Sequence, residues 1–269
     1  MNIELLLTEL KDLEIDNYRV HLAKMAYGSN PLDTLASSST DWKDWQTYKG
    51  GKRNRFPSKY IVTFAQINGN SFLFGGIFEI IDRSGEVYDV IPLGTHKNLI
   101  GRLVIEYKSN LGQVTVVKPN TFLQNARIKE LYSSRYRGEA FKSINSINHN
   151  YSSLEVIFKN ELSDWKTALS SVKGVYLLTD TKEGKHYVGS AYGEDGIWGR
   201  WSNYIYGYTG GNKELIELKD KFTEDYFKKN FKFSILETVG SIVTKEEILK
   251  LEALWKEKLL TRTHGYNSN

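Results

Sequence analysis

Two short runs joined by a five-residue turn constrain the fold of this chain more than any other feature. Residues 174–180 (GVYLLTD) are β-branched, apolar and aromatic, and residues 186–190 (HYVGS) form a second short run. The link between them contains Gly184, which can adopt a positive φ in a turn. We therefore predict an antiparallel hairpin with Tyr176 and Tyr187 on paired strands. Tyrosine is common in strands and the chain contains 17, so packing alone could also explain this pair.

A helix predicted over residues 197–206 follows the hairpin. Arg200 and Tyr204 are four residues apart, so they project together from one side of this helix. A guanidinium beside a neutral hydroxyl can bind a phosphate group. A third strand is expected over residues 231–237.

The last long helix carries a carboxylate at an unexpected position. Thr244 and Glu247 have the spacing of a capping box, and Glu252 falls on the apolar side of the helix that they open. A carboxylate on an inward face needs a partner, which is either a salt bridge or a bound cation. Near the C-terminus, Asn267 either hydrogen-bonds across the same site or simply ends the fold.

The first half of the chain has a different pattern. Strands with tight turns between residues 59 and 117 predict a small barrel or a strongly curved sheet. The remaining elements expected there are helices within 3–26, a loop over 28–40, a helix over 126–132 and a strand over 154–158. The fold class is thus α+β, with a β-rich, barrel-like domain over residues 1–160 and a small α/β domain over residues 161–269.

The net charge of +4 lies entirely in residues 1–160, since the remainder is balanced. Bases alternate with aromatic residues in two stretches there, a pattern that suits contact with nucleic acid. The alternatives are an ordinary solvated surface for the charges and, for Trp42, Trp45 and Tyr48, one face of a helix packed in the core. The predicted contacts with DNA phosphates are Lys52, Arg53, Arg55, Arg135 and Arg137.

Several classes of protein are excluded or disfavoured by composition. The chain has no cysteine, which rules out disulfides, a thiolate nucleophile and a cysteine-based zinc site. No apolar run is long enough to cross a bilayer, and the N-terminus lacks the pattern of a signal peptide. We therefore expect a protein of the cytoplasm, of bacterial or phage type, with no membrane partner.

Taken together, the motifs resemble those of the GIY-YIG nuclease superfamily over about residues 165–269. The similarity rests on five features in the family's order and spacing, namely Gly174-Val175-Tyr176, Tyr187-Val188-Gly189, Arg200, Glu252 and Gly265-Tyr266-Asn267. It implies a three-stranded antiparallel sheet flanked by helices. It also implies a phosphodiester hydrolase that acts on DNA, expected here to be double-stranded.

The resemblance also implies a role for each site residue. Tyr176 would activate the attacking water, and Tyr187 would support that hydroxyl and the phosphate. Arg200 would stabilise the charge that develops on the phosphodiester, with Tyr204 beside it as in the excision-repair type. Glu252 would hold a single divalent cation, Mg²⁺ or Mn²⁺, in each active site, and Asn267 would orient its neighbours. The chain differs from the family's pattern in that no lysine closely follows Tyr187-Val188-Gly189.

Other interpretations remain open at this point. Asp89 followed by Glu106 and Lys108 matches a second nuclease pattern, PD-(D/E)xK, although such short patterns often arise by accident. The chain could instead be a DNA-binding protein with a degenerate nuclease domain. As an endonuclease, it could select a restriction sequence, a modified base, or a damaged or branched structure. A single site cuts one strand, so double-strand cleavage would require a homodimer or two successive events.

Overall fold

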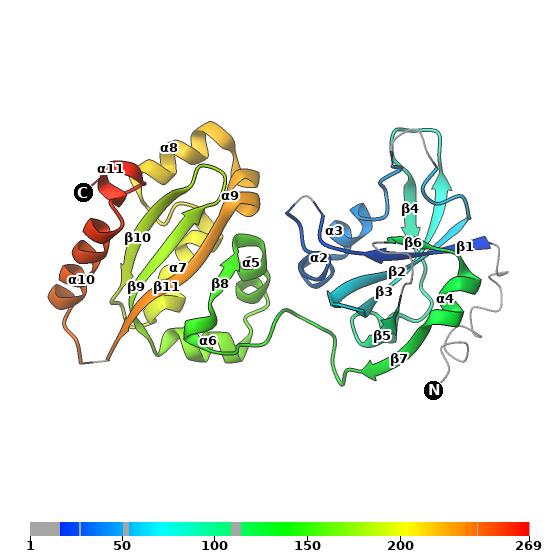
Figure 1. Cartoon of the computed structure of the whole chain (residues 1–269), viewed down its shortest axis with the longest axis horizontal. Helices are drawn as coiled ribbons and strands as arrows, with labels where there is room; N and C mark the ends of the chain where they lie inside the picture. Colours follow the sequence, from blue (N-terminus) through cyan, green and yellow to red (C-terminus); the bar gives the residue numbers. More distant parts are fainter. Residues whose placement is uncertain (1–16, 27, 51–53, 109–113, 241, 269) are drawn as a thin grey trace. The chain divides into compact units, whose positions relative to one another are not determined.

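The computed structural model describes residues 17–26, 28–50, 54–108, 114–240 and 242–268. The chain divides into two compact units, Met1–Tyr136 and Arg137–Asn269, and each is treated by itself (Figure 1). This division lies before the boundary predicted near residue 160. The reason is that residues 148–159 form strand β8 and helix α5, which pack into the second unit. None of the described helices is long and apolar enough to cross a membrane.

The first unit is built on a curled, seven-stranded sheet. The strand order is β6-β1-β2-β3-β5-β7, with β4 also paired to β3. The strands are β1 (Tyr18–Ala23), β2 (Tyr60–Asn68), β3 (Ser71–Asp82), β4 (Asp89–Pro92), β5 (Leu103–Tyr107), β6 (Val116–Val117) and β7 (Ala126–Leu131). The short helices are α2 (Pro31–Ser37), α3 (Ser39–Asp44), η3 (Lys97–Leu99) and α4 (Pro119–Asn125). The predicted strands between residues 59 and 117 are confirmed. The end strands β6 and β7 do not pair with each other in the described ranges, so barrel closure stays a prediction.

Three local predictions for this unit were wrong. The helix expected toward residue 25 is strand β1, which is mostly buried and pairs in parallel with β2. The loop expected over 28–40 contains α2 and the start of α3, because Asn30 and Ser38 act as helix N-caps rather than turn residues. The helix expected over 126–132 is strand β7, which is held by its antiparallel pairing with β5. The predicted helical residues before position 17 lie outside the described part of the chain.

His21 on β1 makes the stability of this unit depend on pH. Its side chain is 1% exposed, and burial lowers its pKa to about 3. The unfolded chain therefore takes up a proton near pH 6.5 while the folded chain does not, so stability falls as the pH drops from about 6.5 towards 3. We expect a loss of roughly 2–3 kcal/mol between pH 7 and pH 4.5 from this residue.

Urea unfolding of the wild type and of His21→Gln at both pH values measures this effect. The variant should lose less stability on acidification, while His264→Gln, on an exposed residue, should behave as the wild type. Identical pH dependence in His21→Gln and the wild type would contradict the expectation.

The second unit contains a four-stranded antiparallel sheet in the order β10-β9-β11-β8. Its strands are β8 (Asn148–Asn150), β9 (Lys173–Asp180), β10 (Lys185–Ala191) and β11 (Phe231–Val239). Its helices are η4 (Ile144–Ser146), α5 (Tyr151–Lys159), α6 (Ser163–Ser170), α7 (Gly196–Gly207), α8 (Lys213–Phe222), α9 (Glu224–Asn230), α10 (Lys245–Lys258) and α11 (Thr261–His264). The predicted hairpin is β9–β10, and the third strand is β11. Strand β8 adds a fourth member to the three-stranded sheet that was expected.

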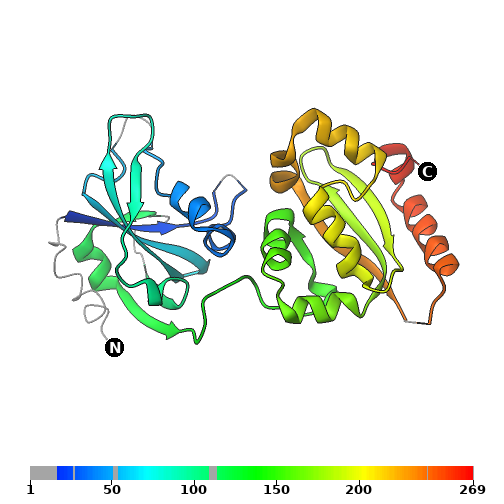
Figure 2. The same ribbon diagram turned by 180° about the vertical axis from the view of Figure 1, so that it is seen from behind.

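The strand expected over residues 154–158 was also wrong, because this segment lies within helix α5. Leu154, Ile157 and Phe158 follow the i, i+3, i+4 spacing of one helical face, and all three are buried in the core of the second unit. The capping box at Thr244 is present as predicted and opens α10. Figure 2, which shows the chain from behind, places the yellow helix α7 in front of the strands of this sheet.

Candidate active site

The site is organised by the hairpin β9–β10, in which Gly189 lies opposite Tyr176. A Cβ atom at Gly189 would lie 2.4 Å from the Tyr176 hydroxyl, so only glycine leaves room for this ring. Gly174 has a φ of 155°, and a Cβ there would lie 2.1 Å from the Glu237 carbonyl oxygen. The glycines of both motifs are therefore required by the close packing of the hairpin against its neighbours.

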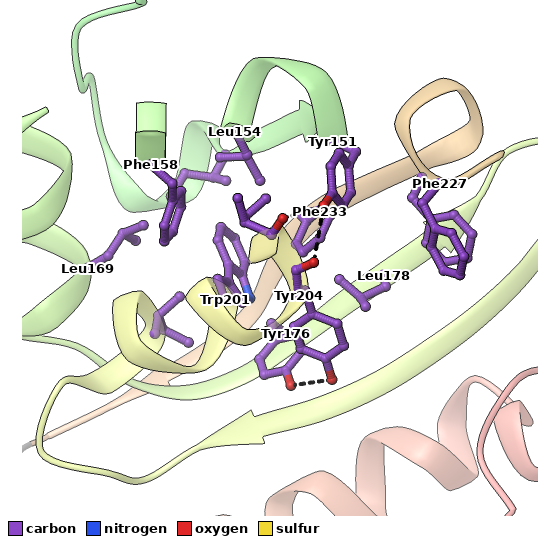
Figure 3. Close-up of a cluster of buried hydrophobic side chains, with 14 of the residues drawn as sticks. Tyr151, Leu154, Phe158, Leu169, Tyr176, Leu178, Trp201, Tyr204, Phe227 and Phe233 are labelled. Atoms are coloured by element: carbon purple, nitrogen blue, oxygen red, sulfur yellow. Dashed lines mark hydrogen bonds between the residues drawn. The ribbon is translucent and has the colours of Figure 1, made fainter. Parts of the chain in front are cut away.

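Helix α7 brings Arg200 and Tyr204 to the hairpin. The Tyr176 and Tyr204 hydroxyls lie 3.0 Å apart and point toward one another (Figure 3). Arg200 Nε donates to the Tyr176 hydroxyl at 3.0 Å, and one of its terminal nitrogens donates to Tyr204 at 3.4 Å. Two of the five N–H donors of the guanidinium are thus engaged, which fixes its orientation.

Both of these tyrosines are fully buried. Burial raises the pKa of Tyr176 well above its ordinary value, although the charge of Arg200 opposes the increase. Burial also raises the pKa of Tyr204, and the neighbouring tyrosine Tyr176 adds to it. Both phenols therefore stay protonated at neutral pH and act as neutral hydrogen-bonding groups.

Helix α10 contributes Glu252 from the other face of the sheet. Tyr187 packs its ring on Tyr204 of α7, whereas Ser190 donates a hydrogen bond to Glu252 Oε2. Residues 187 and 190 are three positions apart on β10, so their side chains point to opposite faces of the sheet. Helices α7 and α10, which they contact, therefore cover opposite faces. Since β10 is an end strand of the sheet, groups from both faces can meet around its edge.

They meet in a pocket of about 550 Å³. Its lining includes Tyr187 and Ser190 of β10, Arg200 of α7 and Glu252 of α10. The structure thus brings three of the predicted site residues to one pocket. Tyr176 does not line it, and its buried hydroxyl instead supports Arg200 from behind.

Asn267 is buried and braces the edge strand. Its side-chain oxygen accepts from the Val188 N–H at 2.9 Å, and its side-chain nitrogen donates to the Val188 carbonyl at 2.9 Å. These two bonds satisfy the N–H and the carbonyl of Val188, which lies between Tyr187 and Gly189 on the outer edge of β10. Asn267 therefore holds the strand that carries Tyr187 and does not itself line the pocket.

Lys256 and Ser190 are site residues that sequence reasoning missed. Lys256 Nζ lies 2.7 Å from Glu252 Oε1, and both side chains are largely buried. The salt bridge that was one of the two interpretations of Glu252 is therefore present. The i, i+4 spacing of Glu252 and Lys256 was visible in the sequence and could have indicated this pair. The contact of Ser190 depends on how α10 packs against β10, which has no local signal.

A divalent cation fits the pocket only if few of its ligands come from the protein. No group of three or more carboxylate or imidazole ligands is found among the described residues. Mg²⁺ commonly keeps several waters and binds through one or two carboxylates plus substrate phosphates. Glu252, which lines the pocket, is compatible with such a cation, and Lys256 would compete with it for the same carboxylate.

The predicted DNA contacts are spread over the chain. Lys52 and Arg53 lie outside the described residues. Arg135 and Arg137 are exposed and belong to different units, and each donates one hydrogen bond to a backbone carbonyl. Arg55 is half-buried and donates to the His21 ring at 3.0 Å.

The second nuclease pattern does not form a site. Asp89 pairs with Asp82 and Glu106 pairs with Ser71, at opposite ends of β3. The path along β3 between these ends is roughly 35 Å at the usual rise of an extended strand. Glu106 instead forms a solvent-exposed ion pair with Lys108 at 3.6 Å.

Comparison with known proteins identifies similar endonucleases. No family model matches the chain. The probable intron-encoded endonuclease bI1 of Neurospora crassa is 32% identical over 99 residues, which are 35% of this chain and 21% of that protein. The chain thus spans about a fifth of the length of this curated relative.

Two solved structures of the catalytic domain of intron endonuclease I-TevI are also similar. One is the domain itself, 27% identical, and the other is a mutant of it, 26% identical. They cover 36% of this chain and 98% and 94% of their own chains, each with a TM-score of 0.29.

Proposed function

We propose that the chain is a DNA endonuclease of GIY-YIG type that hydrolyses phosphodiester bonds with the help of a divalent cation. The observation that carries the proposal is the convergence of Tyr187, Arg200 and Glu252 on one polar pocket. The motifs of the hairpin and the similarity to an intron-encoded endonuclease support the same assignment. The second unit would cut DNA, and the first would select the target, either in a restriction-like manner or by a base modification.

Each residue then has a defined task in hydrolysis. Arg200 has N–H donors beyond those held by the two buried tyrosines, and these can bind the phosphate oxygens that gain charge in the transition state. Glu252 would hold the cation, which would act as a Lewis acid on a phosphate oxygen when bound. Of the two motif tyrosines, Tyr187 is the one that lines the pocket, so we assign to it the contact with the attacking water. Tyr176 and Tyr204 keep Arg200 in place.

Incubation of supercoiled plasmid DNA with the full chain tests the proposal. Nicked product should form in Mg²⁺ or Mn²⁺ and not in EDTA, and unmodified, hydroxymethylated and glucosylated DNA should be compared side by side. No cleavage of any substrate in either metal would contradict the nuclease assignment and favour a DNA-binding protein that has lost its activity.

The two motif tyrosines are expected to differ when each is replaced with phenylalanine. Tyr187→Phe removes a side-chain hydroxyl of the pocket and should lower the cleavage rate about 10²-fold with little change in stability. Tyr176→Phe removes buried hydrogen bonds to Arg200 and Tyr204 and should also cost about 1 kcal/mol of stability. Single-turnover cleavage and thermal unfolding of both variants measure the difference. Full activity in Tyr187→Phe would contradict its assignment.

A further inference from the structure

A second pocket, larger than the candidate active site, lies in the first unit. Its volume is about 950 Å³, and its lining includes His21 of β1, the aromatic residues Trp45 and Tyr48 that follow α3, and Arg55. Pockets of about 300–1,000 Å³ that combine aromatic walls with a few convergent polar groups are typical of small-molecule sites. No part of the proposed hydrolysis uses this pocket.

A chain of buried hydrogen bonds orients Arg55 in this pocket. The Gln46 side-chain nitrogen donates to the Trp42 carbonyl at 3.1 Å, so its side-chain oxygen is left as an acceptor. That oxygen lies 2.6 Å from His21 Nδ1, which must therefore donate. His21 Nε2 is then the acceptor of the hydrogen bond from Arg55 at 3.0 Å. Gln46 and His21 are almost fully buried, so the chain holds the guanidinium in one orientation.

The charge of Arg55 has no acidic partner within the described part of the first unit. Arg55 is half-buried, and its Cζ lies 5.2 Å from the Phe56 ring centroid and 5.7 Å from that of Tyr48. A partly buried cation without a counter-ion is unfavourable unless its remaining donors are satisfied. One of the five N–H donors of this side chain is engaged by His21. A ligand with hydrogen-bond acceptors can take up others.

The aromatic lining indicates a flat ligand. Tyr48 is 53% exposed, which leaves part of its ring available for stacking. Trp45 donates from its indole N–H to Thr34 at 3.0 Å, which fixes the ring on the wall of the pocket. Nucleobases combine a flat ring with acceptor edges, and arginine reads the acceptor edge of guanine through paired hydrogen bonds. Bases outside a helix commonly stack on aromatic side chains.

We infer that this pocket receives one nucleobase turned out of the DNA helix, with its acceptor edge on Arg55 and its ring against Tyr48 and Trp45. The volume is sufficient for a base together with its sugar or with a bulky substituent. Extruding a base costs only a few kcal/mol, and least where the base is unpaired. The inference rests on the proposed action on DNA and assigns target choice in the first unit to a base-reading pocket.

Saturation-transfer NMR with the full chain tests the pocket directly. The probes are free deoxyguanosine, deoxycytidine, 5-hydroxymethyldeoxycytidine and its glucosylated form. At least one should give a signal with the wild type, and the signal should fall at least fivefold in Arg55→Gln and Tyr48→Ala. Tyr206→Ala is the matched control, since Tyr206 is 61% exposed and lies in the other unit. Because Tyr48 is exposed, its replacement leaves the fold intact even if Arg55→Gln does not fold.

A second measurement separates a base in DNA from a free nucleotide. In EDTA, a duplex with one unpaired 2-aminopurine should change its fluorescence on binding to the wild type and to Glu252→Ala, but much less with Tyr48→Ala. No nucleoside signal, equal signals in all variants, or nucleoside binding without the 2-aminopurine response would each overturn the inference. If DNA is cleaved but the nucleoside and 2-aminopurine signals are absent, only the base-binding pocket is rejected. If the signals are present but DNA is not cleaved, only the nuclease assignment is rejected.

Discussion

Replacing Arg200 with lysine is expected to lower the rate of DNA cleavage about 10³-fold, which corresponds to roughly 4 kcal/mol of transition-state stabilisation. The guanidinium donates to the Tyr176 hydroxyl at 3.0 Å and to the Tyr204 hydroxyl at 3.4 Å while it lines the pocket. A lysine ammonium is a single point of charge and cannot hold both tyrosines and a phosphate group at once. The charge is kept in the variant, but the geometry is lost.

Single-turnover cleavage measures this change, with DNA binding determined separately in EDTA. Arg262→Lys is the matched control, because Arg262 is an exposed arginine that does not line the pocket. We expect the Arg200 variant to bind DNA within about twofold of the wild type, since the lost contact is made mainly in the transition state. A cleavage rate within threefold of the wild type would show that Arg200 does not stabilise the reacting phosphate.

Replacing Glu252 with glutamine is expected to lower cleavage by about 10³-fold or more at any concentration of Mg²⁺. The amide keeps the shape of the side chain and an acceptor for Ser190, but it removes the charge that would hold the cation. It also leaves Lys256, which is 8% exposed, without its ion-pair partner at 2.7 Å, so some loss of stability is expected. Thermal unfolding distinguishes this structural effect from the loss of catalysis. Undiminished cleavage by the folded variant would remove Glu252 from the site.

Lys256→Met is expected to have the opposite effect on cation binding. Lys256 and a bound cation would compete for the Glu252 carboxylate, so removal of the lysine charge should increase the affinity for Mg²⁺. The concentration of Mg²⁺ at half-maximal cleavage should fall several-fold. A rise in that concentration would show that Lys256 supports the cation site instead of competing with it.

Local sequence signals predicted the hairpin and the site residues of the second unit that lie close together in the chain. The hairpin was predictable because its strands, its turn and the glycines at positions 174 and 189 lie within one short stretch. Arg200 and Tyr204 were predictable as a pair because helical spacing alone places them together. The motif spacing also indicated Tyr187 and Glu252, which the structure brings to the same pocket.

Some of the features that were missed depend on contacts between distant residues, and others were ambiguous in the local sequence. Strand β1 is defined by its parallel pairing with β2, about forty residues later, and no periodicity within residues 18–23 identifies that partner. Strand β7 likewise depends on its pairing with β5. In α2 and α3, the residues that suggested a loop are helix caps, since asparagine and serine favour both environments. The different tasks proposed for Tyr176 and Tyr187 follow from how each is buried and from which of them lines the pocket. A sequence motif gives neither piece of information.

The most direct test of the proposed chemistry compares three proteins in one cleavage assay under single-turnover conditions in Mg²⁺. The wild type and Arg262→Lys should cut duplex DNA at the same rate, and Glu252→Gln should bind the same DNA with similar affinity but leave it intact. Equal rates for all three proteins would contradict the assignment of the pocket at Glu252 as a phosphodiesterase site. The same conclusion would follow if the wild type cleaved none of the unmodified, hydroxymethylated and glucosylated DNA.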